Sequence, residues 1–420
     1  MSVDYARPER PRAHAWERLW RPYWALPAIV AVGSAGLGLT LPRADERLAG
    51  WVPYVFESGP DGARQLLGTI ASAMISVTGL VFSLTMVVLQ LASSQFTPRL
   101  LGQFLQSRVV QLTLGVFVGS FLYALTVLRL IRGGDGTDFV PQVSVTLAFG
   151  YVLAAVAFFI AFIHHITQSI RLSHVLIDIG ARTTASARRL YAGQRPSATW
   201  SPAPQTPRQV LEFPAGPGVI TALDSTGLVR WAAQRDCVAV LEFGLGDFRV
   251  EGDRMAVLWG LDDLRASSPS DLAGELAELV GRSGEPDLAT DFSYGIRQLT
   301  DIAERALSPG VNDPTTAIQV INQLYAVLAP LACRPDLSPY LTDDEGVVRA
   351  MYRAPSFAGL ICGSLQDIAH YAAESPRVCS RLREVAELLS ERAIETHRPS
   401  LRRVLASLPP ELPSESAPED

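Results

Sequence analysis

The sequence predicts an α-helical membrane protein with four transmembrane helices followed by a cytoplasmic α+β region. The first observation is a set of apolar runs without Asp, Glu, Lys or Arg, at residues 22–42, 65–98, 109–128 and 139–170. About 20 apolar residues span the core of a bilayer, so each run can cross the membrane once. The second observation is that charged residues return from Arg171 onward, which indicates a soluble region after the fourth span.

The composition excludes several classes of enzyme. All 36 basic residues are arginine, so the chain lacks a P-loop lysine, a kinase strand lysine, a Schiff-base lysine and a lysine that could carry biotin or lipoyl. The net charge of -6 and the absence of a basic tract predict no nucleic-acid partner. No CxxC pair is present, so we expect reduced, mostly buried thiols at Cys237, Cys333, Cys362 and Cys379.

The arginines near the spans favour an orientation with both termini in the cytoplasm. Residues 1–21 carry five arginines and residues 171–189 carry four, whereas the arginines of residues 43–64 are diluted by acidic residues. Short cytoplasmic loops are enriched in Lys and Arg, which favours this orientation. We expect a multi-pass protein of the inner (plasma) membrane. The first span has no convincing small-residue cleavage site and is expected to be an uncleaved anchor.

Composition and periodicity divide the chain into segments. The stretch "GQRPSATWSPAPQTPRQ", residues 193–209, is a Pro-rich linker. Helical periodicity dominates from residue 261, with helices expected at 269–281, 291–307, 314–332, 356–374 and 377–395. The expected domains are a cytoplasmic N-terminal segment (1–21), the four-helix transmembrane domain (22–170), a cytoplasmic helix and linker (171–209), a small β unit (210–260), a helical cytoplasmic domain (261–400) and an acidic disordered tail (401–420).

Four stretches of this sequence resemble a known family. They are "GLVFSLTMVVLQLASSQFTPRLL", "LGVFVGSFLYALTVLR", "SVTLAFGYVLAAVAFFIAFIHHITQSI" and "ALSPGVNDPTTAIQVINQL". Together they resemble the bacterial membrane proteins catalogued as domain of unknown function family 2254, over about residues 20–400. The resemblance implies a four-helix membrane part and a following cytoplasmic region. It carries no established substrate, activity or catalytic residues.

A second likeness lies inside the small β unit. The segment "GDFRVEGDRMAVL", residues 246–258, is similar to the half-motif of barrel-sandwich domains such as biotinyl modules. A swinging-arm role is excluded because the lysine that would be modified does not exist. The alternative interpretation is a hairpin that turns at Glu251-Gly252-Asp253.

A polar stripe runs along one face of the second span. Steps of three and four residues place its members on one side of a helix, opposite apolar residues such as Leu67, Met74 and Val81. The stripe could pack helices together, and each hydrogen bond across such an interface stabilises it by about 0.6 kcal/mol. It could instead line a pore, which would require an oligomer and would be weakly selective because no charge interrupts it. The stripe consists of Thr69, Ser72, Ser76, Gly79, Ser83, Met86, Gln90 and Ser93.

The third span carries a GxxxG step, Gly115 and Gly119, extended by Ser120 and Ala124. Small residues at this spacing let two helix backbones approach closely, so we expect a packing seam.

The inner ends of the second and fourth spans carry Arg99, His164, His165 and Arg171. One interpretation is a pH-sensing or metal-binding pore mouth, since histidine changes charge near neutral pH. The other is anchoring at the membrane interface, with Arg171 holding lipid phosphate. Adjacent histidines point to different faces of a helix, which argues against a metal site.

The most motif-like stretch after the spans is "ALSPGVNDPTTA", residues 306–317. Asp313 before Pro314 is typical of a helix N-cap. The alternative places Asn312, Thr315 and Thr316 around a helix N-terminus that holds an anion or a partner carboxylate, although the charge of Asp313 would compete for the same amides. Ahead of this stretch, Arg297, Asp301 and Arg305 form an expected row of solvated charges.

The expected function is that of an oligomeric channel-like permeation protein lined by the second span. The alternative is a non-transporting scaffold or sensor with a cytoplasmic regulatory domain. We find no GxSxG, HExxH or GxGxxG motif in a suitable setting, so we expect no enzyme, no catalytic residue, no cofactor and no metal. The expected partners are the lipid bilayer and further copies of the chain, while a soluble partner stays open.

Overall fold

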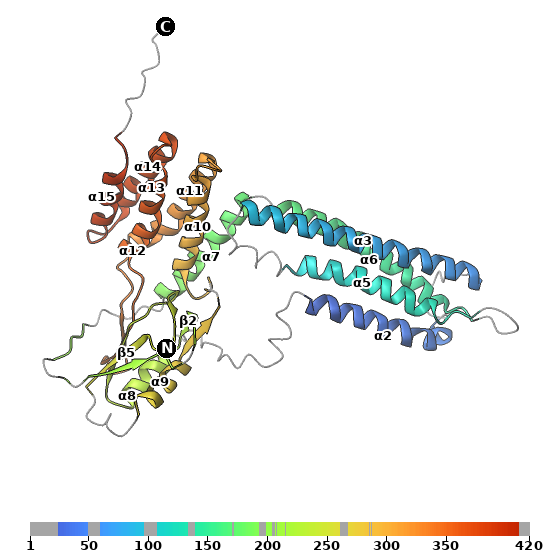
Figure 1. Cartoon of the computed structure of the whole chain (residues 1–420), viewed down its shortest axis with the longest axis horizontal. Helices are drawn as coiled ribbons and strands as arrows, with labels where there is room; N and C mark the ends of the chain where they lie inside the picture. The colour runs from blue at the N-terminus through green and yellow to red at the C-terminus, as the bar shows by residue number, and fades with distance from the viewer. Residues whose placement is uncertain are drawn as a thin grey trace, which may run out of the picture. The chain divides into compact units, whose positions relative to one another are not determined.

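The computed structural model describes residues 24–48, 59–95, 107–132, 139–169, 172–192, 199–203, 206, 208–214, 216–260, 268–284, 286 and 288–410. These residues fall into two compact units that divide between His174 and Val175. We call them the membrane unit and the C-terminal unit, and Figure 1 shows each of them.

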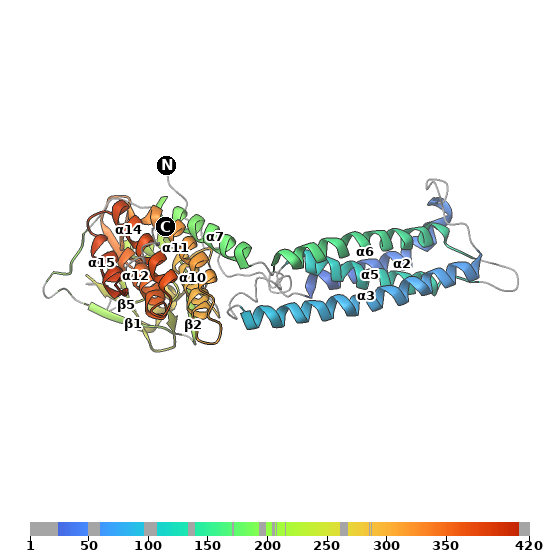
Figure 2. The ribbon, with the colours of Figure 1, turned by 90° about the horizontal axis from the view of Figure 1, so that it is seen from above.

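The membrane unit contains four long helices that lie alongside one another (Figure 2). They are α2 (Ala25–Leu48), α3 (Pro60–Gln95), α5 (Arg108–Leu128) and α6 (Gln142–Ser169). Each is long and apolar enough to cross a membrane, so four candidate spans occur where the sequence predicts them.

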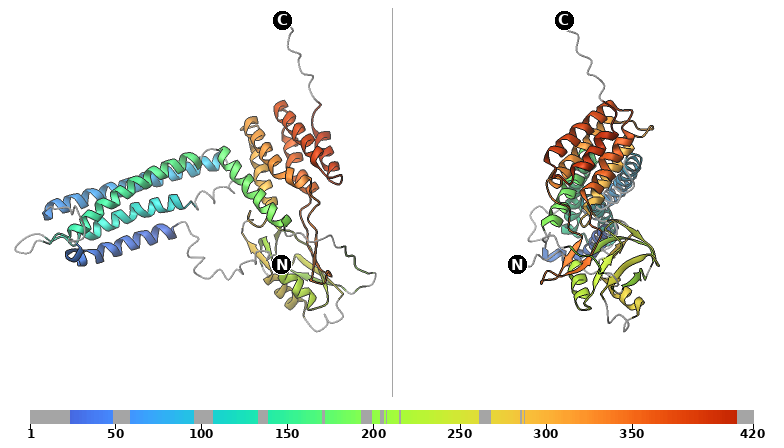
Figure 3. Two further views of the ribbon diagram at one scale, coloured as in Figure 1. Left: turned by 180° about the vertical axis from the view of Figure 1, so that it is seen from behind. Right: turned by 90° about the vertical axis from the view of Figure 1, so that its left-hand side faces the viewer.

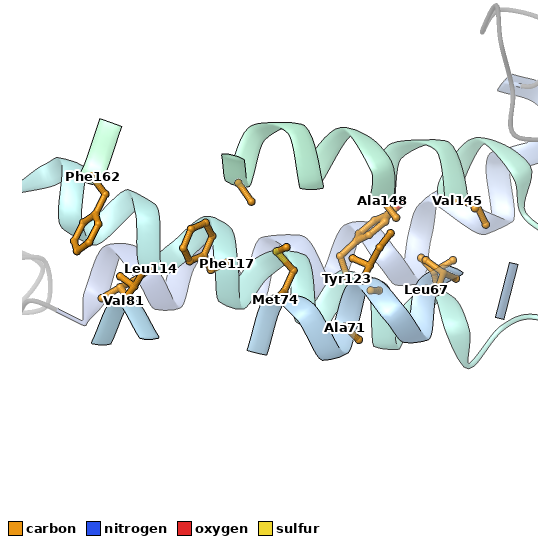
Figure 4. Close-up of a cluster of buried hydrophobic side chains, with 14 of the residues drawn as sticks. Leu67, Ala71, Met74, Val81, Leu114, Phe117, Tyr123, Val145, Ala148 and Phe162 are labelled. Carbon is orange, nitrogen blue, oxygen red and sulfur yellow. The ribbon is translucent and has the colours of Figure 1, made fainter. Parts of the chain in front are cut away.

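Helix α5 is the centre of the membrane unit, because α2, α3 and α6 all pack against it. Its buried Phe117 and Tyr123 lie among apolar side chains of the neighbouring helices, such as Leu67 and Met74 of α3 (Figure 4). The apolar face of α3 is therefore directed toward α5 rather than toward lipid.

The GxxxG step of α5 forms the seam on which α2 lies. A Cβ atom added at Gly115 would lie 3.1 Å from Cβ of Val30, and one added at Gly119 would lie 2.6 Å from Oγ of Ser34. A larger residue at either position cannot fit without moving α2, so the expected packing seam is confirmed.

A chain of polar contacts joins α2, α5 and α6 inside the membrane unit. The carboxylate of Asp45, which is 5% exposed, accepts hydrogen bonds from the backbone N–H of Val143 (3.2 Å) and Ser144 (2.9 Å) and from the Ser144 hydroxyl (2.9 Å). Tyr123 donates to the Ser144 carbonyl at 2.9 Å and stacks on Tyr151, with ring centroids 5.0 Å apart. An acidic residue at the end of α2 thus satisfies orphan amides in the first turn of α6.

The C-terminal unit contains two sheets. The five-stranded sheet has the order β1-β5-β3-β8-β7, and the three-stranded sheet has the order β4-β2-β6. Neighbouring strands are antiparallel except for the parallel pair β3 and β8. The strands are β1 (Arg208–Glu212), β2 (Gly218–Leu223), β3 (Val238–Leu241), β4 (Phe248–Arg249), β5 (Arg254–Trp259), β6 (Val280–Ser283), β7 (Tyr340–Thr342) and β8 (Val348–Met351).

The helices of this unit gather in two places. Helices α10 to α15 form one group, and α8 and α9 lie beside the sheets (Figure 3). The helices are α7 (Leu172–Ala192), α8 (Ser225–Ala233), α9 (Pro269–Glu278), α10 (Phe292–Ala306), α11 (Pro314–Ala332), α12 (Phe357–Ile361), a π-helical turn (Cys362–Gln366), α13 (Asp367–Tyr371), α14 (Pro376–Arg392) and α15 (Arg398–Ser407).

Two expected boundaries are wrong. Strands β6, β7 and β8 come from the part expected to be only helical, so the sheets extend beyond residues 210–260. These strands have three or four residues each, too few to leave a periodic signal. The expected tail at 401–420 begins too early, because α15 continues to Ser407 and buries Leu401 and Val404.

Two smaller expectations also change. Residues 250–253 form a tight turn in which Gly252 has a φ of +85°, but the flanking strands β4 and β5 pair in different sheets, so the segment is not a simple hairpin. All four cysteines are free, as expected. Only Cys237 and Cys379 are buried, whereas Cys333 and Cys362 are exposed.

Candidate functional site

The polar stripe lies on the exposed side of α3. Its opposite side supplies Leu67, Met74, Val81 and other buried side chains to the core of the membrane unit. The stripe positions Thr69, Ser72, Ser76, Gly79, Ser83, Met86 and Gln90 are all exposed, while the side chain of Ser93 lies outside the described residues.

The small and polar members form a narrow strip. A helix rotates by about 100° per residue, so the exposed small and polar members of the stripe fall within an arc of about 80° around the helix axis. Gly79 lies at one edge of this arc and Thr69 at the other. Exposed apolar side chains flank this arc, with Ile75 and Phe82 on one side and Leu80 on the other. The exposed face of α3 is therefore a polar strip between two apolar shoulders.

The exposed face of α6 has a different character. Its exposed residues include Phe149, Leu153, Val156, Ile160 and Ile163, which are all apolar. Such a face suits lipid tails, which offer no hydrogen-bond partner. The exposed faces of α3 and α6 therefore differ in polarity along the middle of each helix.

Local hydrogen bonds satisfy part of the strip. The Thr69 hydroxyl donates to the Gln65 carbonyl and the Ser76 hydroxyl donates to the Ser72 carbonyl, each at 2.8 Å. These bonds use the hydroxyl protons and leave oxygen lone pairs directed to the outside. A Cβ atom added at Gly79 would meet no other atom within 4 Å, so the strip is open at its middle.

The two histidines near the C-terminal end of α6 do not form a shared site. His165 lies 2.7 Å from the Ser107 hydroxyl through Nε2, whereas His164 is exposed. Within the described ranges no group of three His, Cys, Asp or Glu residues could hold a metal ion. Arg99 and Arg171 lie outside the described residues, so the interpretation as a mouth stays a prediction.

The segment 306–317 builds a helix cap. The Asp313 carboxylate accepts from the backbone N–H of Thr315 and Thr316, both at 3.1 Å, and from the Thr316 hydroxyl at 2.6 Å. Asn312 precedes the cap with a φ of +46°, a left-handed conformation that asparagine tolerates. The expected N-cap is confirmed, and because Asp313 occupies these amides, an anion would have to displace it.

Comparison with known proteins places the chain in a family. The model of the family described as predicted membrane protein, DUF2254, matches residues 20–387. The chain belongs to this family. An uncharacterized protein of Mycobacterium tuberculosis (strain CDC 1551 / Oshkosh) is 30% identical over 390 residues, which covers 89% of this chain and 73% of the relative.

Other relatives give the same picture. Uncharacterized proteins of Mycobacterium bovis and of Mycobacterium tuberculosis strain H37Rv match with the same identity and coverage. No solved structure matches this DUF2254 protein. Because these relatives are uncharacterized, a function must be argued from the residues of the chain itself.

Two interpretations of the α3 stripe remain for this DUF2254 protein. Among the described residues, the stripe does not pack against another helix of the same chain. It is exposed, and the opposite side of α3 faces α5. Contact with another copy of the chain and lining of a permeation path both stay consistent with the exposed strip.

The expected row of charges on α10 belongs to a larger cluster, in which Arg297 contacts three carboxylates. Arg297 donates to Asp301 at 2.7 Å, to Asp367 at 3.0 Å and to Glu304 at 3.1 Å. Burial raises the pKa of Glu304, with Arg297 acting in the opposite direction and Asp301 and Asp367 reinforcing the rise. The cluster fastens α13 to α10.

Replacing Asp313 by alanine is expected to lower the free energy of unfolding by about 1 kcal/mol at pH 7, the usual cost of losing a cap. The Thr316 hydroxyl, which donates to Asp313, lowers the pKa of the carboxyl below its ordinary value. The contribution is therefore present above about pH 4 and disappears as the pH falls through the lowered pKa. Thermal unfolding between pH 7 and pH 3 measures the difference, with replacement of the exposed Glu374 by alanine as the control. An equal difference at both ends of the range would contradict the assignment.

Proposed function

We propose that this membrane protein assembles from several copies in the inner membrane and that the polar strip of α3 lines a permeation path between them. The single observation that supports this proposal is the outward direction of the strip. A helix that buries its apolar side within its own chain and exposes its hydroxyls and Gln90 cannot meet lipid on that face without cost.

The shoulders of the strip support an arrangement around an axis. If α3 helices of neighbouring copies face one another, apolar residues such as Leu80 and Phe82 can pack between copies. The polar strip at the middle of the face then points toward the axis of the assembly. Four helices of one chain enclose no wide pore, so the path requires several copies.

The chemistry of the strip fits a weakly selective path. Hydroxyl oxygens with free lone pairs, a glycine backbone and the amide of Gln90 can replace part of the hydration of a small solute or ion. No charged side chain occurs between Arg64 and Arg99, so the strip itself supplies no strong charge selection. Selection would come from the two mouths of the path.

The orientation that we propose places both termini and the C-terminal unit in the cytoplasm. The arginines of residues 1–21 and 171–189 support this orientation. The C-terminal unit would then assemble and regulate the copies from the cytoplasmic side, and the barrel-sandwich likeness of residues 246–258 stays a prediction.

Water access to the strip tests the proposal. In a variant without the four native cysteines, Ser76→Cys and Ser83→Cys are each combined with a charged, membrane-impermeant thiol reagent. We expect both to react at least tenfold faster than Ala157→Cys, because thiol reagents of this kind need a hydrated thiolate. Ala157 is the matched control, since it is exposed on the apolar face of α6. Equally slow reaction at all three positions would show that the strip faces lipid or a dry interface.

A further inference from the structure

A cavity of about 280 Å³ lies between α7 and α11 in the C-terminal unit. Its volume is just below the range of about 300–1,000 Å³ that small-molecule sites usually occupy. The helices approach closely one turn before it, where a Cβ atom added at Gly180 would lie 2.7 Å from Oε1 of Gln323. Beyond this contact the cavity opens between Thr184 and Val327.

Each helix presents one face to this cavity. Thr184, Arg188 and Tyr191 of α7 follow steps of four and three residues and therefore share a side. Val327 and Leu331 of α11 do the same, and Arg334 follows just beyond the end of the helix. Together with Ala187 they give the cavity an apolar floor and two arginines.

The two arginines are free to bind a ligand. Within the part of the chain that the structure describes, neither Arg188 nor Arg334 forms an ion pair with a carboxylate or a hydrogen bond through its side chain. The neighbouring Arg189 differs, because its guanidinium donates to the Ala289 carbonyl at 3.1 Å. Asp336 is the acidic group close enough to influence Tyr191, and its carboxylate accepts from the Phe357 backbone N–H at 2.7 Å and lies 3.3 Å from Nε2 of His397.

Tyr191 adds a hydroxyl donor to the cavity. Its side chain is only 7% exposed, and its hydroxyl has no hydrogen-bond partner among the residues described here. The guanidinium of Arg334 lies over its ring at 6.0 Å. Burial raises the pKa of Tyr191 to about 12, so the hydroxyl keeps its proton at neutral pH and can donate it in a hydrogen bond.

We propose that this cavity binds a small organic phosphate monoester. Arg188 and Arg334 bind the phosphate, the Tyr191 hydroxyl donates to it, and the floor of Ala187, Val327 and Leu331 holds the organic part. Guanidinium groups match phosphate oxygens in geometry, and two of them balance the charge of about −1.5 to −2 on a phosphate monoester at pH 7. This assignment is independent of the proposed permeation path.

Calorimetric titration of the full-length protein in an uncharged detergent tests the site. The probes are phenyl phosphate, inorganic phosphate and phenol. We expect saturable binding of phenyl phosphate, with a Kd at least tenfold lower than that of either fragment, because only the ester uses both the arginines and the floor. Dihexanoyl phosphatidic acid distinguishes a lipid source of the phosphate from a soluble one.

Three variants identify the residues. Arg188→Gln and Arg334→Gln should each raise the Kd for phenyl phosphate at least tenfold, and Tyr191→Phe should raise it several-fold. Arg189→Gln, which removes the same charge from the adjacent position, should leave it within twofold. Absence of binding to the wild type, or an equal effect of Arg188→Gln and Arg189→Gln, would overturn the site and leave the arginines as charges that only neutralise helix C-termini.

Discussion

Replacing Asp45 by alanine should lower the free energy of unfolding of the membrane unit by about 3 kcal/mol. The Asp45 carboxylate accepts three hydrogen bonds from Val143 and Ser144 in a site that is almost closed to solvent. Removing it leaves two buried backbone N–H groups of α6 without an acceptor, and each costs about 1–3 kcal/mol. Detergent-titrated unfolding followed by circular dichroism measures the loss.

Two further variants test whether the Asp45 carboxylate itself causes this loss. Asp45→Asn keeps one acceptor oxygen, so its effect should lie between those of the wild type and the alanine variant. Asp61→Ala is the matched control, because the Asp61 side chain is fully exposed and its contact with Arg64 is a surface pair. An effect of Asp45→Ala no larger than that of Asp61→Ala would contradict the role of Asp45 as a clamp between α2 and α6.

Replacing Gly119 by leucine is expected to be at least as damaging, because the seam between α2 and α5 has no room for a side chain. The first added atom already meets Oγ of Ser34, which is itself held by a 2.9 Å contact with the Tyr151 hydroxyl. Moving Ser34 aside would break that contact, and the remaining atoms of leucine would push α2 away. We expect a loss of about 3 kcal/mol, the upper part of the usual range for overpacking.

The control for this variant lies on the partner helix. Gly33→Leu introduces the same side chain at a position where an added Cβ meets nothing within 4 Å. It should leave unfolding almost unchanged in the same assay. Comparable losses from Gly33→Leu and Gly119→Leu would contradict the role of the seam, because leucine is a better helix former than glycine at both positions.

The membrane part of the fold could be predicted from the sequence because its signals are local. Long uncharged runs define the spans, and Gly115 and Gly119 mark a seam through their spacing alone. Asp313 and Pro314 likewise indicate the start of α11, because the cap and the first helical residue are neighbours in the sequence. In each case the deciding contacts lie within one helix turn or on one helix face.

The remaining features depend on contacts between distant residues. Asp45 and Ser144 are 99 positions apart, and nothing near Asp45 in the sequence indicates which helix end it meets. Strand β8 pairs with β3, far earlier in the chain, and β7 pairs with β8. The cavity beside Tyr191 joins α7 to α11, so neither helix reveals it alone.

The polar stripe lies between these two cases. Its period identifies one face of α3, as Ser72, Ser76 and Ser83 show. The sequence cannot say whether that face points inward, because this depends on which side of α3 its neighbours occupy. The packing of Leu67 and Met74 against α5 decides the question and leaves the stripe on the outside.

The measurement that tests the central claim most directly is ion flux from liposomes that contain the purified protein. It compares the wild type with Ser76→Leu, and with Ala157→Leu as the matched control on the apolar face of α6. We expect flux from the wild type and from Ala157→Leu, and a loss of at least tenfold in Ser76→Leu while the same oligomer is still recovered. No flux from the wild type over a broad set of ions and pH values would contradict a permeation path and favour a non-transporting scaffold or sensor.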